Sequence, residues 1–393
     1  MKNVKILKGN CLDVLKDMDD ESVQCCITSP PYYALRNYGT RPVIWDGVLN
    51  CNHEWITTCR PQTKLGNEGY TDPKHKTLAD ITKRSPEGQF CTKCGAWSGS
   101  LGAEPTPELY IQHLTQIFHE VKRVLKKDGT LWLNIGDSYA GSGKAGNNKE
   151  YQKKHKEFGK ISKHEERFGL SGIVPEGLKP KDLIGIPWML AFALRADGWY
   201  LRCDIIWHKP NCMPESVKDR PTRSHEYIFL MSKSRKYYYD TDAIREPCIC
   251  IEKKPRPSGM ERNAKKYRDK VKYGGGGSGF KGHSGIYKAD GSLLNHPKGK
   301  NKRSIWTVNT KPFKGAHFAV FPPELIKPCI LAGSREQDIV IDPFGGSGTT
   351  AIESSKLNRK SIIIELKDDY IDITNKRLQD EGITSKENIN RFF

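Results

Sequence analysis

Apolar residues recur with strand-like and helix-like spacing at both ends of the chain. Near the start, "VKILKG" and "SVQCCITS" predict two buried strands, and "CLDVLKDM" predicts a short helix between them. Near the end, strands and helices alternate in the same way: "PELIKPCILAG" (helix), "DIVIDPF" (strand), "TTAIESSKL" (helix), "KSIIIEL" (strand) and "DYIDITNKRLQD" (helix). This alternation predicts an α/β fold whose doubly wound, mostly parallel, Rossmann-like sheet uses both ends of the chain.

The middle of the chain continues this rhythm. An amphipathic helix is predicted from Pro107 to Lys126, with Gly129 as its stop signal, and "TLWLNIGDSY" follows as a strand. Farther on, "IPWMLAFALRADG" predicts a buried helix. The segments "WYLRCDIIWHK" and "EYIFLMSKS" predict two strands, which we expect to pair antiparallel at the edge of the sheet.

Three stretches interrupt the rhythm. Residues 35–107 are rich in Gly, Pro, Thr and Cys and show little periodicity, which indicates an insertion. Residues 140–182 are polar and Gly-rich, as in a mobile loop or lid, and residues 252–303 form a second insertion. We therefore expect one domain built from residues 1–34, 108–251 and 304–393.

Charge points to a polyanionic partner. The formal net charge of the 393 residues is +18, and Lys253 to Arg303 holds 15 Lys and Arg against 3 Asp and Glu. Its glycines, set among Lys, Arg and Tyr, suit a segment that becomes ordered on nucleic acid; a plain disordered linker is an equal alternative. Since no run of 18 apolar residues occurs, we expect a cytoplasmic protein without membrane contact.

The stretch "ITSPPYYALRNYG" follows the second predicted strand and carries the first chemical signal. Pro30 and Pro31 cannot continue a strand, so they fix an extended turn that presents Ser29, Tyr32 and Tyr33. Taken alone, this turn is either a stiff loop or a platform for chemistry.

The stretch "DIVIDPFGGSGTTAIES" carries the second signal. A strand, a Gly-rich turn and a helix allow the backbone to approach a ligand closely, and Glu365 ends the next strand, where an acid can bind ribose hydroxyls. Asp342 before the turn would repel a pyrophosphate but attract an α-ammonium group. The turn therefore favours an adenosine that carries a sulfonium amino acid over a dinucleotide. An oxidoreductase would fit the sheet but not the Pro-Pro-Tyr stretch.

Together, "TSPPYY" and "DPFGGSGTT" resemble the S-adenosylmethionine-dependent DNA amino-methyltransferases, in the permuted β class that places the catalytic motif first. The resemblance implies a catalytic part in residues 1–34 and 108–251, a basic target-recognition segment in 252–303 and a cofactor-binding part in 304–393. It also implies double-stranded DNA with a flipped base as substrate, and a restriction endonuclease as a candidate partner. The oligomeric state stays open.

The resemblance assigns roles to individual residues. The catalytic motif is Ser29, Pro30, Pro31 and Tyr32, in which the Ser29 hydroxyl and the Pro30 carbonyl accept hydrogen bonds from the target amino group and Tyr32 stacks on the flipped base. The expected cofactor-binding residues are Asn10, Cys11, Phe321, Asp342, Phe344, Gly346, Gly348, Thr349 and Glu365. Asn10 departs from the family, which commonly has Asp there.

The first residue of the catalytic motif bears on the target base. In the family, S-P-P tends to accompany N4 of cytosine and D-P-P N6 of adenine, so Ser29 favours cytosine. N6 of adenine is the alternative, and a non-catalytic nucleic-acid-binding protein with this fold is the second. Four nearby residues are candidates for contacts with phosphates or the target base, or are solvated surface groups: Lys209, Asn211, Arg220 and Arg223.

The first insertion carries a metal-binding signal. "CNHEW" provides Cys51 and His53, and "FCTKCGAW" provides Cys91 and Cys94. A Cys-x2-Cys knuckle with a Cys-x-His pair offers four ligands for tetrahedral Zn²⁺, which would stabilise a segment with few apolar residues. Cys59 or His75 could replace one ligand, and free thiols are the alternative.

Overall fold

A computed structural model describes residues 4–34, 40–48, 50–57, 88–141, 174–175, 177–247, 298–311 and 321–388. Contacts between Cα atoms group the chain into two units, residues 1–239 with 304–393 and residues 240–303. Both of the sheets described below belong to the first unit.

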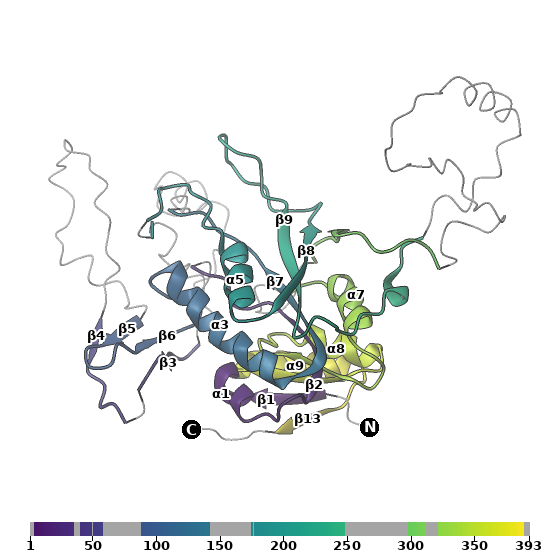
Figure 1. The fold of residues 1–393 in the computed structure, drawn as a ribbon, viewed down its shortest axis with the longest axis horizontal. Helices are drawn as coiled ribbons and strands as arrows, with labels where there is room; N and C mark the ends of the chain where they lie inside the picture. Colours follow the sequence, from purple (N-terminus) through teal and green to yellow (C-terminus); the bar gives the residue numbers. More distant parts are fainter. Residues whose placement is uncertain are drawn as a thin grey trace, which may run out of the picture. The chain divides into compact units, whose positions relative to one another are not determined.

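The first unit contains the large predicted sheet (Figure 1). Its strands are β1 (Val4–Lys8), β2 (Val23–Thr28), β7 (Leu125–Ile135), β8 (Tyr200–His208), β9 (His225–Ser232), β10 (Ile305–Thr307), β11 (Ile339–Asp342), β12 (Lys360–Glu365) and β13 (Ser385–Asn388). They lie in the order β10-β8-β9-β7-β2-β11-β12-β1-β13. Only β9 runs antiparallel, against both β7 and β8, so the mostly parallel sheet is confirmed.

Helices cover both faces of this sheet. They are α1 (Cys11–Lys16), α3 (Pro107–Val124), α5 (Ile186–Ala196), α7 (Pro323–Gly333), α8 (Thr349–Lys356) and α9 (Asp368–Asp380). Leu7 and Ile364 pack with α1, α3 and α5, whereas Ile6 and Ile363 pack with α8 and α9. Because neighbouring strand residues point to opposite faces, these are two separate cores on the two sides of the sheet. The doubly wound architecture is thereby confirmed.

Helix α3 has the buried face that its apolar spacing predicted, but it does not end where Gly129 predicted. The Thr106 hydroxyl caps its start by accepting the Leu109 N–H at 3.2 Å, and the helix buries Leu114, Ile117 and Phe118 completely. It ends at Val124, and β7 begins at the next residue, so Gly129 lies inside a strand. The prediction that Gly129 stops the helix is therefore wrong. A Cβ at Gly129 would lie 2.9 Å from the Lys126 carbonyl and 3.0 Å from the Gln24 carbonyl, so the backbone around this position favours glycine.

The first insertion is also folded where it is described. Strands β3 (Val43–Trp45), β4 (Trp55–Thr57), β5 (Gly88–Cys91) and β6 (Trp97–Gly99) form a small antiparallel sheet in the order β3-β6-β5-β4, beside α3 in Figure 1. Buried His113 of α3 stacks on Trp45 and on Trp97, with ring centroids 4.5 and 5.4 Å away. His113 also contacts Glu104 (2.9 Å) and Asp46 (3.3 Å) through its two ring nitrogens. These contacts attach the small sheet to the main domain.

The described part of the second unit is a short pairing of residues 240–247 with 298–303. Glu246 and Lys300 exchange backbone hydrogen bonds of 2.9 Å in both directions. Hydrogen bonds from Arg245 and Lys298 lower the pKa of Asp242 to about 2. Most of the basic segment, and most of the predicted loop at 140–182, lie outside the described residues. Among the described helices, none is long and apolar enough to cross a membrane.

The core under α3 gives a stability prediction. Phe118 is fully buried, whereas Phe192 on α5 is 47% exposed. We expect Phe118→Ala to lower the free energy of unfolding by roughly 3–5 kcal/mol, because it removes a ring from a close-packed site. Phe192→Ala serves as the matched control, with a change below about 1 kcal/mol. Denaturant unfolding followed by circular dichroism measures both, and equal effects would contradict the assignment of Phe118 to the core.

Candidate active site

One cleft of the first unit lies where four parallel strands end. Strands β2, β11, β12 and β1 are neighbours in the sheet, and the residues that follow their carboxyl ends line the cleft. It encloses about 1090 Å³ of empty space, open solvent included. Of the predicted catalytic and cofactor-binding residues, all except Gly348 line it. The two motifs, about 300 residues apart in the sequence, therefore meet in one place.

The Asp342 carboxylate connects the two motifs directly. Its Oδ1 accepts the Thr28 hydroxyl at 2.6 Å and the Phe344 N–H at 3.1 Å, and its Oδ2 accepts the Thr350 hydroxyl at 2.7 Å. Asp342 is buried, which raises its pKa to about 6 even though these donors favour the ionised form. The carboxylate thus holds the end of β2 against the start of α8.

The Gly-rich turn after β11 depends on missing side chains. A Cβ at Gly345 would lie 1.8 Å from Ile363. Gly348 has φ +76°, and a Cβ there would lie 2.5 Å from Thr374. Gly348 is the N-cap residue of α8, so its predicted role becomes one of shaping the turn, while the backbone before it borders the cleft. No other residue type fits these two positions without displacing β12 or α9.

Glu365 at the end of β12 lies against the same turn. Its Oε2 accepts the Gly346 N–H at 2.9 Å, and its Oε1 accepts the N–H groups of Leu366 and Lys367 at 2.9 and 2.8 Å. Burial raises the pKa of Glu365 despite these donors. The carboxylate borders the cleft and is fixed in place by backbone groups before any ligand arrives.

Hydrogen bonds and packing fix the second half of the Ser-Pro-Pro-Tyr segment. The Tyr110 hydroxyl of α3 donates to the Pro31 carbonyl at 2.6 Å. Tyr32 packs its ring against Gly136, where a Cβ would come within 2.6 Å, and donates its hydroxyl to Glu226 Oε2 at 2.7 Å. Pro30 lines the cleft, and within the described residues no hydrogen bond ends on its carbonyl.

The remaining predicted residues also line the cleft. The side chain of Asn10 caps α1 by accepting the Leu12 N–H at 3.3 Å. Cys11 is buried beside it, and burial raises the pKa of its thiol well above the ordinary range. Phe321 and Phe344 also line the cleft, and Phe344 belongs to the Gly-rich motif.

Glu226 and Asn134 contact Tyr32, but the sequence contains no motif that predicted either residue. Asn134 on β7 donates to Glu226 at 3.3 Å and to the Tyr227 carbonyl at 3.1 Å, and Lys209 pairs with the other oxygen of Glu226. Lys209, a candidate for a DNA contact, therefore has an internal partner. So do Arg220, which pairs with Glu215, and Asn211, which exchanges two 2.9 Å hydrogen bonds with Thr310.

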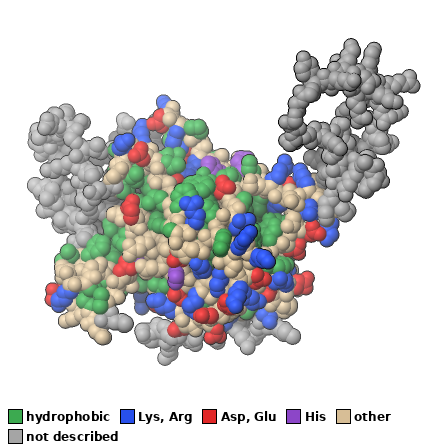
Figure 2. Space-filling view, viewed as in Figure 1, with side chains coloured by type: hydrophobic (Ala, Val, Ile, Leu, Met, Phe, Trp, Pro, Cys, Tyr) green, Lys and Arg blue, Asp and Glu red, His purple; other side chains and the backbone are tan. Residues whose placement is uncertain are grey.

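Arg223, the last of these candidates, lies 3.8 Å from Asp137. On the face shown in Figure 2, Lys and Arg side chains lie beside Asp and Glu side chains. The sequence places most of the net positive charge in residues 253–303.

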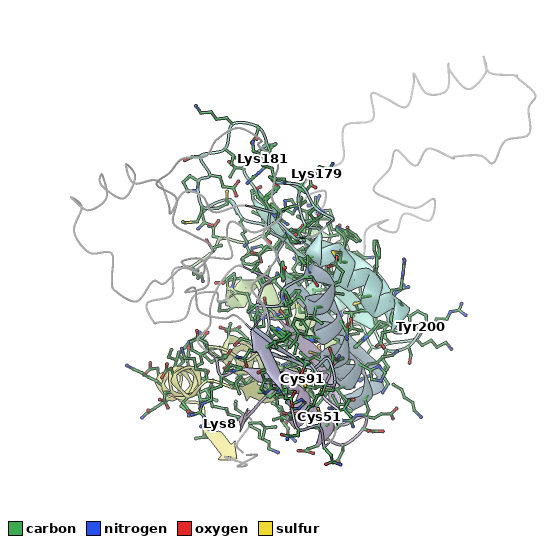
Figure 3. The ribbon with its side chains drawn as sticks, turned by 90° about the vertical axis from the view of Figure 1, so that its left-hand side faces the viewer. Lys8, Cys51, Cys91, Lys179, Lys181 and Tyr200 are labelled. Atoms are coloured by element: carbon green, nitrogen blue, oxygen red, sulfur yellow. The ribbon has the colours of Figure 1, made fainter. Side chains whose placement is uncertain are left out.

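The four predicted metal ligands meet in the small sheet. The ligand atoms of Cys51, His53, Cys91 and Cys94 all lie within 4.8 Å of one another, and Figure 3 shows Cys51 and Cys91 side by side. Cys59 and His75 lie outside the described residues.

Comparison with known proteins identifies the family of this fold and site. The family model described as DNA methylase, of the N6 and N4 type, matches residues 23–376. The chain belongs to this DNA methylase family. It is a DNA methyltransferase of the S-adenosylmethionine-dependent class that modifies amino groups of bases, as the paired motifs predicted.

Curated relatives of this DNA methylase cover nearly its whole length. The type II methyltransferase M.SmaI of Serratia marcescens is 37% identical over 96% of this chain and 91% of its own. M.Cfr9I of Citrobacter freundii is 38% identical over 97% of this chain and 89% of its own. Among solved structures, the cytosine-N4-specific PvuII DNA methyltransferase is similar in fold, with a TM-score of 0.51, 14% identity, and coverage of 100% and 97% of the two chains.

The hydrogen bond between Tyr32 and Glu226 gives a prediction for this DNA methylase. Tyr32→Phe keeps the ring but removes the donor, and Glu226→Gln keeps the shape of the acceptor but removes its charge. Either change should lower the DNA methylation rate, and the double variant should be no slower than the slower single one, because one contact is lost in all three. Single-turnover methylation with labelled cofactor measures this.

Glu215→Gln is the matched control, since Glu215 pairs with Arg220 and not with Tyr32. Fully additive losses in the double variant would mean that the two residues act separately.

Proposed function

We propose that the protein transfers a methyl group from S-adenosylmethionine to N4 of cytosine in double-stranded DNA. The single observation that carries the choice of cytosine is Ser29, which stands first in Ser-Pro-Pro-Tyr and borders the cleft. N6 of adenine is the competing target. A non-catalytic DNA-binding role is disfavoured, because both motifs are complete and meet in one cleft.

The target amino group would be held by acceptors that this chain fixes in advance. The lone pair of an exocyclic amino nitrogen is delocalised into the ring, so acceptors aimed at its hydrogens favour the pyramidal form that can attack a methyl group. The Ser29 hydroxyl and the Pro30 carbonyl supply these acceptors, on a backbone that the prolines and the Tyr110 hydrogen bond hold rigid. Tyr32 stacks on the base after it leaves the duplex.

The cofactor supplies an electrophilic methyl group on a sulfonium centre. Methyl transfer would break the bond from carbon to sulfur and form a bond from carbon to nitrogen, the sulfur would leave as a neutral thioether, and the extra proton on the amino nitrogen would pass to water. Asp342 attracts the α-ammonium group and Glu365 accepts hydrogen bonds from the ribose. Asn10, Cys11, Phe321, Phe344, Gly346 and Thr349 enclose the remainder of the cofactor.

The proposal extends to other ligands and partners. The basic segment at 252–303 contacts DNA and selects the recognition sequence, and a structural Zn²⁺ ion occupies the Cys51, His53, Cys91 and Cys94 cluster. The full-length similarity to type II methyltransferases supports a restriction endonuclease with the same recognition sequence as a functional partner.

Mass analysis of nucleosides tests the choice of target. Unmodified DNA of varied sequence is incubated with the protein and labelled cofactor and then digested to nucleosides. The expected product is N4-methylcytosine, because Ser29 is the acceptor. N6-methyladenine as the sole product would sink the cytosine assignment but keep the enzyme class.

The variant Ser29→Ala tests the role of the Ser29 hydroxyl in this reaction. We expect it to lower the rate of transfer by about 10²-fold or more, since one preorganised acceptor is lost, while cofactor affinity stays close to that of the wild type. Equal loss of cofactor binding and transfer would contradict the role given to Ser29.

The raised pKa of Asp342 predicts how cofactor affinity depends on pH. With a pKa of about 6, the carboxyl is largely protonated at pH 5 and ionised at pH 7, and only the ionised form attracts an ammonium group. Cofactor affinity should therefore increase roughly tenfold between pH 5 and pH 7. Isothermal titration calorimetry measures this, and Asp342→Asn should bind more weakly with a flat profile. An affinity that falls or stays constant in the wild type over this range would contradict the role of Asp342.

The same pKa shift fixes the sign of a stability effect. Since the folded pKa lies above the ordinary value of 3.8, the unfolded chain ionises first as pH rises. Asp342 by itself therefore lowers the stability of the cofactor-free protein as pH rises from about 4 to about 6.

A further inference from the structure

The insertion that carries the Cys and His residues has little core of its own. We call its described parts, residues 40–48, 50–57 and 88–104, the metal module. Its strands expose Ile44 and Ile56 at 51% each, and Val48 is 60% exposed. The buried aromatic residues of its sheet, Trp45 and Trp97, face His113 of α3 at one side. The end of the module that holds β4 and the turn after β5 lacks such a core, so we expect another interaction to stabilise it.

The Cys and His cluster lies at that end. Cys91 ends β5, Cys94 lies in the turn between β5 and β6, and Cys51 and His53 precede β4. The turn is closed by the Cys91 N–H to the Ala96 carbonyl (2.8 Å) and by the Gly95 N–H to the Cys91 carbonyl (3.0 Å). Gly95 has φ +76° with open space around it, as in a knuckle that wraps two sulfur atoms around an ion.

The distances between the ligand atoms fit a tetrahedral metal ion. The Sγ atoms of Cys51 and Cys91 are 3.9 Å apart, and Cys94 Sγ is 3.4 Å from His53 Nδ1. Tetrahedral Zn²⁺ with ordinary bond lengths would place two sulfurs about 3.8 Å apart and a sulfur and a nitrogen about 3.5 Å apart. A disulfide would need about 2.05 Å, which excludes a covalent bond between Cys51 and Cys91. Three thiolates and one imidazole in this geometry select Zn²⁺ over hard, oxygen-preferring cations.

The opposite end of the module borders the reaction cleft. In the antiparallel pairing of β3 with β6, Trp45 lies opposite Trp97 and Val43 opposite Gly99, so β6 leads from the turn that holds Cys94 toward Ser100 and Leu101 at the cleft. The two pairs are about 7 Å apart along the strands. The module residues that line the cleft are Thr40, Arg41, Val43, Trp45, Ser100 and Leu101.

The module also touches the Ser-Pro-Pro-Tyr segment. The Ala34 N–H donates to the Gly102 carbonyl at 2.8 Å, and a Cβ at Gly102 would come within 3.0 Å of the Tyr32 carbonyl. Buried Glu104 accepts the Gly102 N–H at 2.7 Å and contacts His113. In contrast, Asp342 and Glu365 are held by Thr28, Thr350 and backbone groups of the Gly-rich turn.

We propose that Zn²⁺ bound by Cys51, His53, Cys91 and Cys94 fixes the metal module as the wall of the cleft on the target-base side. Loss of the ion would release residues 40–45 and 99–102 from the catalytic segment and leave the cofactor half intact. The metal would therefore govern DNA binding and methyl transfer but not cofactor binding. This role rests on the proposed function of the cleft, whereas the metal site itself does not.

The test compares the full-length protein with Cys94→Ser, and uses Cys212→Ser as the control because Cys212 is partly exposed and lies outside the cluster. Zinc content is measured by inductively coupled plasma mass spectrometry, cofactor affinity by calorimetry and methylation by single turnover. The wild type and Cys212→Ser should contain one zinc per chain. Cys94→Ser should lose most of it, keep cofactor affinity within about twofold and transfer methyl about 10²-fold more slowly, because the target-base side loses its alignment.

A second measurement covers the case in which Cys94→Ser does not fold. Zinc is removed from the wild type with a chelator after mild thiol modification, the thiols are restored, and zinc is added back; both transfer and zinc content should recover. A wild type without bound zinc would overturn the metal site. Bound zinc whose removal leaves transfer unchanged, or abolishes cofactor binding equally, would overturn the role of the module. Bound zinc with no transfer to any DNA by the wild type would overturn the proposed function alone.

Discussion

The Asp342 carboxylate is the contact on which the site depends. It is buried at the end of β11 and accepts hydroxyl protons from Thr28, at the end of β2, and from Thr350, in the first turn of α8. The bond to Thr28 joins elements that are distant in the sequence, since Thr28 and Asp342 are 314 residues apart. Thr28 directly precedes Ser29, so this side chain links the Ser-Pro-Pro-Tyr segment to the Gly-rich turn, in addition to the pairing of β2 with β11.

Such an arrangement works because the sheet brings the chain ends together. Strands β2 and β11 are parallel neighbours, although more than 300 residues separate them, and their carboxyl ends lie at the same edge. Burial disfavours the charge on Asp342, and the hydroxyl donors reduce this penalty only in part. The group is therefore a structural clamp, and under the proposed function the same carboxylate attracts the ammonium group of the cofactor.

The sequence revealed those parts of the structure that rest on local patterns. The buried strands and amphipathic helices of the main sheet were predicted because their apolar spacing is strong. Strands β3 to β6 were missed, because three- and four-residue strands with exposed Ile44 and Ile56 show no periodicity. The helix end was predicted wrongly because a glycine after a helical pattern is a common stop signal, whereas Gly129 is confined by the backbone carbonyls of Lys126 and Gln24.

The site residues also divide into those that a local sequence motif marks and those that only the fold brings to the site. Ser29 to Tyr32, Asp342 and Glu365 stand in motifs with fixed spacing, so they could be named from the sequence. Glu226 and Asn134 reach Tyr32 only through the pairing of β7 with β9, and nothing in their own neighbourhoods marks them. Likewise, the inference that the metal module borders the cleft needs the register of β3 against β6.

The most direct test of the account is a crystal structure of the protein with a non-reactive cofactor analogue and a duplex that contains its recognition sequence. We expect a cytosine turned out of the duplex and stacked on Tyr32. Its N4 should lie within hydrogen-bond distance of Ser29 Oγ and the Pro30 carbonyl, facing the cofactor's transferable group. A target base bound elsewhere, or a cofactor that does not contact the turn after Asp342, would contradict the central claim that the two motifs form one methyl-transfer site.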